Sequence, residues 1–138
     1  IDFEQNILQE VVGIQDQIFA SYGGFLSIEI KKNSDFLISD LLKQNDKLKG
    51  LENNITLLYT GKSRFASNIA KNQKNNFKEK ISSYETLYQL AHEAKNVIEN
   101  NYRLEDLGLI MNESWKIKKT LSDKVSNIFI NNIYDVWR

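Results

Sequence analysis

One carboxylate in the chain has a setting that suits proton transfer. Asp16 lies between Gln15 and Gln17 and shortly after Gly13, at the predicted start of a helix. The neighbouring amides and the positive end of the helix favour the ionised form of such a carboxylate and can direct it. On these residues alone, the more frequent interpretation is a helix-start aspartate that stabilises its helix by roughly 0.3–1 kcal/mol.

A second group of residues could bind an anion. Thr60 to Arg64 follow a predicted strand and precede a predicted helix. The motif is not a nucleotide phosphate loop, because Thr56 stands where that loop needs its first glycine. Free amides at the helix start, flanked by Lys62 and Arg64, nevertheless form a fair anion site. A solvated turn, capped by Ser63, is the alternative.

The remaining candidates are interpreted as structural. His92 is the only histidine, lies off the apolar stripe of its helix, and has no partner at the spacing of a metal site or catalytic triad. We therefore expect it to be exposed and predict no metal site. Tyr84 and Tyr88 lie on the same predicted stripe and are expected in the core, and the lysines of 116–119 are expected at a helix end.

The hydropathy pattern predicts about five helices around these candidates. Apolar residues recur at helical spacing in the segments 1–12, 14–22, 65–70, 77–98, 104–118 and 128–137. Gly13 separates the first two segments, and Gly23-Gly24 end the second. Ser122 to Asn127 is predicted to be a loop.

Alternation and turn residues predict a small sheet. Leu26, Ile28 and Ile30 alternate with polar residues, and Asn33-Ser34 can turn the chain into a second strand at 36–38. The apolar run 55–59 predicts a further strand. The fold class is therefore α+β, with a small antiparallel sheet (the hairpin plus a further strand) packed against the helices.

Composition excludes several classes of protein. Lysine plus arginine balance aspartate plus glutamate at 18 each, so no nucleic-acid partner is expected. No apolar run is long enough to span a bilayer, so no membrane partner is expected and a cytoplasmic location is the default. The absence of cysteine excludes disulfides and thiolate chemistry. The 138 residues are expected to form one domain or part of one, since both ends interrupt helical patterns.

Three ordered motifs resemble those of GHMP kinases, and especially of the heptose 7-phosphate kinases in that family. The first is the run 12–17, followed by Ala20 and 23–25. The second is 57–61 with Ser63, Arg64 and Ala66, and the third is the run 121–127 ahead of a helix. The resemblance therefore covers nearly the whole chain and implies the fold of the C-terminal domain of that family.

The resemblance implies phosphoryl transfer from ATP, with Mg²⁺, to the anomeric hydroxyl of a sugar phosphate. Asp16 is then the expected catalytic residue, as base or orienter of the hydroxyl. Gln15 and Gln17 are candidates to bind sugar hydroxyls, while Lys62 and Arg64 are candidates to bind the phosphate of the sugar. Lys124, in the loop 122–127, is a further candidate for substrate binding.

Two expectations limit this interpretation. The glycine-rich segments that bind ATP in this family are expected before Ile1 and after Arg138, so the isolated chain is expected to be inactive. Alternatives are a kinase of the same family for fucose or galactose, and a noncatalytic interaction domain with the same fold.

Overall fold

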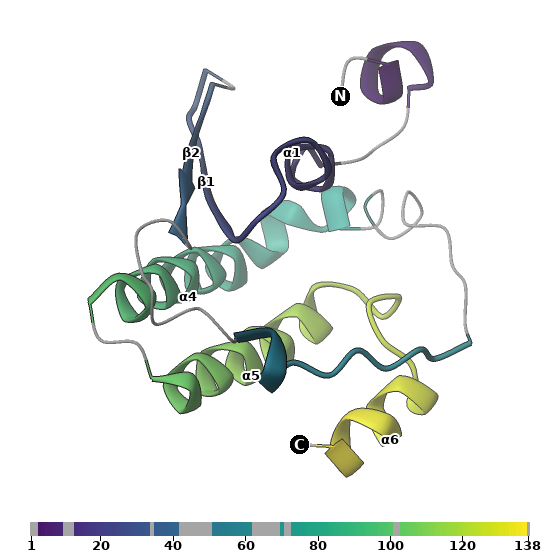
Figure 1. Ribbon diagram of the computed structural model, residues 1–138. Helices are drawn as coiled ribbons and strands as arrows, with labels where there is room; N and C mark the ends of the chain where they lie inside the picture. The colour runs from purple at the N-terminus through teal and green to yellow at the C-terminus, as the bar shows by residue number, and fades with distance from the viewer. Residues whose placement is uncertain are drawn as a thin grey trace.

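Two long antiparallel helices form the centre of the described structure. The computed structural model describes residues 3–9, 13–33, 35–41, 51–61, 70, 73–100 and 103–137, and all structural statements concern these residues. Helix α4 (Ile81–Asn100) runs one way and α5 (Leu104–Leu121) returns beside it (Figure 1). A 3-10 turn, η4 (Phe77–Lys80), leads into α4. The predicted helices 77–98 and 104–118 are confirmed.

Charge and apolar spacing explain why these helices form where they do. Glu105 and Asp106 lie in the first turn of α5, and Lys118 and Lys119 lie in its last turn. Each sign is placed where the helix macrodipole favours it. The prediction that the lysines of 116–119 lie at a helix end is confirmed.

A small apolar core joins α4 and α5 to the rest of the chain. Its buried side chains come from the end of the β-hairpin, from the 3-10 turn η3 (Leu51–Asn54) and from both helices, and three partly buried residues pack against them. The buried members are Leu41, Leu51, Ile98 and Leu107, and the partly buried ones are Phe25, Ala94 and Leu104. Burial of such side chains, at about 1.5–3 kcal/mol each, is the main stabilising term.

The predicted hairpin is confirmed. Strands β1 (Leu26–Ile30) and β2 (Phe36–Asp40) pair antiparallel, with Ile28 opposite Ile38. At the turn, the Lys31 N–H donates to the Asp35 carbonyl at 2.8 Å, and the Asn33 side-chain amide donates to the Asp35 carboxylate at 2.6 Å. In Figure 1 the hairpin stands on the same side of α4 as the helix α1 (Gln15–Tyr22). The α+β fold class is also confirmed.

The further strand predicted at 55–59 is wrong. The described sheet has two strands, β1 and β2, and residues 55–60 lie outside it without regular structure. Leu57 and Tyr59 are 96% and 91% exposed. A strand needs the hydrogen-bonding edge of a neighbour, and hydropathy alone does not reveal whether such an edge is near.

Two other predictions from apolar spacing are also wrong. The segment 1–12 was expected to be one helix, but its described part, residues 3–9, has a single π-helical turn at Phe3–Ile7. Phe3 and Ile7 are 59% and 64% exposed, so the apolar stripe has no surface on which to be buried. Tyr88 was expected in the core but is 66% exposed and lines a cavity between β1 and α4.

Helix α6 (Ile128–Trp137) packs on α5 through aromatic and polar contacts. The rings of Trp115 and Tyr134 lie 5.8 Å apart, and the Tyr134 hydroxyl donates to Asn112 Oδ1 at 2.6 Å. The Lys119 ammonium lies within 5.8 Å of both ring centres, a distance suited to a cation–π contact. The predicted loop at 122–127 is confirmed.

The helix predicted at 65–70 lies almost wholly outside the described residues. Within the described parts, no helix has both the length and the apolar character needed to cross a membrane.

Candidate functional site

The helix that carries the candidate catalytic residue is α1. Ile18, which is 3% exposed, is its one buried residue and anchors it to the rest of the molecule. The helix ends at Gly23, whose N–H donates to the Phe19 carbonyl at 2.8 Å. Gly23 and Gly24 have φ of 63° and 77°, which glycine adopts without the steric cost of a Cβ. The predicted helix at 14–22 is thus confirmed.

Asp16 lies in the first turn of α1 and is exposed. Its carboxylate is therefore at the positive end of the helix macrodipole and is open to solvent and to a ligand. Gln15 is exposed beside it. A Cβ on residue 13 would lie 3.3 Å from Gln15 Oε1, so Gly13 leaves room for the close approach of this side chain.

Gln17 is held more firmly than its neighbours. It is half-buried, and its Nε2 donates to the carboxylate of Glu4 in the π-helical turn. Its Oε1 is buried and has no hydrogen-bond partner among the described residues. A buried acceptor without a donor costs about 1–3 kcal/mol, so this oxygen would gain from a donor that reaches it. The Ser21 hydroxyl donates to the Gln17 carbonyl at 2.8 Å.

Glu4 is the residue of this site that the sequence did not reveal. It lies 13 positions before Gln17, in a segment that was interpreted only as an apolar helical stripe. A glutamate with no nearby motif carries no signal of its own. Only the helical spacing of the apolar stripe could have suggested which side of the segment Glu4 occupies. That spacing is no guide here, because the segment has a π-helical turn at Phe3–Ile7.

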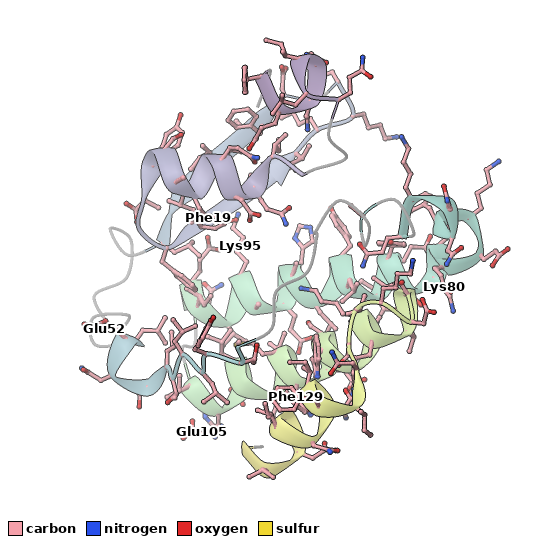
Figure 2. The ribbon with its side chains drawn as sticks, turned by 90° about the vertical axis from the view of Figure 1, so that its right-hand side faces the viewer. Phe19, Glu52, Lys80, Lys95, Glu105 and Phe129 are labelled. Atoms are coloured by element: carbon pink, nitrogen blue, oxygen red, sulfur yellow. The ribbon has the colours of Figure 1, made fainter. Side chains whose placement is uncertain are left out.

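The three basic candidates for phosphate binding are not shown beside Asp16. Lys62 and Arg64 lie outside the described residues. Lys124 is exposed in the loop after α5, where its backbone N–H donates to the Ser122 hydroxyl at 3.1 Å. In both views α4 stands between α1 and this loop (Figures 1 and 2), so the described structure does not bring Lys124 beside Asp16.

The arrangement on α1 presents hydrogen-bonding groups and one carboxylate at successive positions. Three successive positions carry the exposed amide of Gln15, the exposed carboxylate of Asp16 and the hydrogen-bonded amide of Gln17. Such a set offers both hydrogen-bond donors and acceptors to a polyhydroxylated ligand. Among the described residues, no three histidine or acidic side chains gather as a metal site.

Comparison with known proteins identifies relatives of the chain. It is 30% identical over 135 residues to a D-glycero-alpha-D-manno-heptose 7-phosphate kinase of Campylobacter jejuni, covering 96% of this chain and 40% of the kinase. It is 25% identical over 144 residues to a bifunctional fucokinase/GDP-fucose pyrophosphorylase of Arabidopsis thaliana, covering 94% of this chain and 13% of that protein. No protein-family model and no solved structure matches the chain.

Both relatives match nearly all of this chain, while the chain spans less than half of the length of either. Their names describe a heptose phosphate kinase and a fucokinase, which agrees with the motifs around Asp16 and in the run 121–127. The resemblance indicated by those motifs is therefore confirmed, and the chain is homologous to GHMP-type sugar kinases.

Proposed function

We propose that this chain is the substrate-side part of a kinase that phosphorylates the anomeric hydroxyl of a heptose 7-phosphate. The observation that carries the proposal is the position of Asp16, exposed in the first turn of α1, in a chain related to a heptose phosphate kinase over 96% of its length. ATP is the expected phosphoryl donor and Mg²⁺ its expected companion.

The chemistry assigned to this chain is the handling of the acceptor. Asp16 orients the anomeric hydroxyl and accepts its proton, while the sugar oxygen forms a bond to the γ-phosphorus and ADP departs. In a loose transition state, orientation matters more than base strength, so an ordinary carboxylate suffices. Gln15 and Gln17 hydrogen-bond the neighbouring hydroxyls, and Lys62, Arg64 and Lys124 provide positive charge for the phosphate of the substrate.

The nucleotide is assigned to residues outside this chain. The isolated chain is therefore expected to lack kinase activity, and the test requires the full-length protein.

The test compares native and Asp16→Asn proteins with ATP, Mg²⁺ and heptose 7-phosphate, fucose or galactose. The expected result is turnover of heptose 7-phosphate that falls about 10²–10⁴-fold in the variant, the usual share of general acid–base catalysis. Asp106→Asn is a matched control, since Asp106 lies in the first turn of α5, is partly exposed and pairs with Arg103 at 3.8 Å. Its turnover is expected to stay native.

The outcomes separate the alternatives. Turnover of fucose in preference to heptose 7-phosphate would indicate the activity named for the Arabidopsis relative. Undiminished turnover by Asp16→Asn would show that the protein is a kinase but that Asp16 is not its catalytic residue. A native protein that is folded but phosphorylates none of the three sugars would favour a noncatalytic interaction domain.

A further inference from the structure

A cavity of about 480 Å³ lies between β1 and α4, apart from the residues of the proposed active site. Its volume falls within the range of roughly 300–1,000 Å³ that is usual for small-molecule sites. The first strand supplies one wall and α4 the other. The lining residues are Ser27, Ile28, Glu29, Ile30, Lys31, Lys32, Tyr88, Ala91, His92 and Lys95.

Positive charge dominates the polar part of this lining. Lys31, Lys32 and Lys95 line the cavity together with one acidic residue, Glu29. Figure 2 shows Lys95 on the side of α4 that faces α1 and the hairpin. The excess of positive charge along this lining favours a bound anion.

Two acidic residues near these lysines, Glu99 and Asp35, have weak or other contacts. The pairing of Lys95 with Glu99 spans 3.9 Å between partly exposed groups, a geometry that contributes little. The Asp35 carboxylate accepts a hydrogen bond from the side chain of Asn33. The backbone of Lys31 is fixed by its hydrogen bond to the Asp35 carbonyl, so Lys31 leaves the hairpin at a defined point on the rim.

An aromatic surface adjoins the charged part of the cavity. Tyr88 and His92 are one helical turn apart, and their rings meet edge to face with centres 4.4 Å apart. Tyr88 is 66% exposed, although its position on the apolar stripe predicted burial. An exposed ring beside cationic groups suits a ligand that has an anionic end and a ring or other apolar face.

We propose that the cavity between β1 and α4 is a second ligand site, which binds the phosphate group of a small phosphorylated molecule. Lys31, next to β1, and Lys95, on α4, supply positive charge from the two walls. Lys32 adds charge beside Lys31, and His92 donates a hydrogen bond from α4. Tyr88 covers the face of the organic part. This inference does not depend on the kinase proposal, since it uses none of the residues assigned to that reaction.

The test is an NMR titration of the full-length protein with inorganic phosphate, and the reporter is the His92 imidazole resonance, assigned by its loss in His92→Gln. We expect a saturable shift of this resonance at fixed pH and ionic strength. In the double variant Lys31→Gln/Lys95→Gln the apparent Kd is expected to rise at least about tenfold, as the loss of charge-assisted contacts implies. Loss of the shift in this double variant distinguishes the cavity from phosphate bound at the kinase site.

Two matched variants complete the experiment. Lys74→Gln/Lys78→Gln removes the same charge from exposed lysines outside the cavity and is expected to leave the Kd within about twofold. Tyr88→Ala is expected to leave the Kd for inorganic phosphate unchanged. The same variant is expected to raise the Kd for a sugar phosphate severalfold. A shift that grows linearly without saturation, or an equal loss in both lysine pairs, would show general attraction of anions and overturn the site.

Discussion

The α4–α5 pair and the α1 segment are held in different ways. The long helices share a core of buried side chains with the hairpin and η3. In α1, by contrast, Ile18 is the one buried residue. Polar contacts such as the hydrogen bond from Gln17 to Glu4 also hold this helix in place. The difference teaches that the scaffold and the candidate site can be perturbed separately. Burial decides the stability of the first, while a few polar contacts decide the geometry of the second.

Truncation in the scaffold should give the largest effect on stability. Leu107 is 9% exposed and belongs to the core, whereas Leu109 on the same helix is 67% exposed. Leu107→Ala is expected to lower the free energy of unfolding by about 2–5 kcal/mol, because it removes buried contacts and leaves a cavity. Urea unfolding of the full-length protein measures this change.

Leu109→Ala is the matched control, because it removes the same atoms from an exposed position. Its effect is expected to stay within about 0.5 kcal/mol. Equal losses in the two variants would mean that the core shared by α4, α5 and the hairpin does not carry the stability.

A change in the polar support of α1 should act on substrate binding and leave stability almost unaltered. Glu4→Ala removes the acceptor of the Gln17 amide, so that this side chain is no longer held in one orientation. If Gln17 binds a sugar hydroxyl, KM for the sugar should rise about threefold to tenfold, the equivalent of one hydrogen bond, with kcat little changed. Steady-state kinetics with varied sugar concentration separate the two constants.

Glu79→Ala serves as the comparison, since Glu79 is an exposed acid on η4 and should leave KM native. A fall in kcat with native KM in Glu4→Ala would contradict the role given to Gln17. It would place the effect on the chemical step instead.

The smallest effect is expected from an exposed ion pair on the scaffold. Lys116 and Glu113 lie 3.0 Å apart on α5, and both side chains are about half exposed. Glu113→Gln is expected to change stability by no more than about 0.5 kcal/mol. The small difference should shrink in 1 M salt, because the screening length then falls to about 3 Å. A loss above 1 kcal/mol would show that surface charge contributes more to the scaffold than burial suggests.

The elements that could be predicted are those whose signal is local. Helices α1, α4, α5 and α6 follow from three- and four-residue apolar spacing, glycine breaks and end charges, and the hairpin follows from alternation around Asn33. The failures share one cause. The runs 1–12 and 55–59 have the periodicity of a helix and of a strand, but each needs a surface or an edge from another part of the molecule.

The candidate site divides in the same way. The composition of the run 13–17 is enough to place an aspartate between amides at a helix start, and the structure has Asp16 in the first turn of α1. The link from Glu4 to Gln17 and the cationic cavity under β1 have no local signature, since each joins residues that are distant in the sequence.

The sequence by itself determined the chemistry of the single residues, the main helices and the relation to sugar kinases, because these depend on residue type and short-range spacing. Only the tertiary structure decided which apolar segments are buried, which amide is fixed, and which three lysines line one cavity. Those outcomes depend on contacts between distant segments, whose free energies follow from the area and charge that the fold brings together.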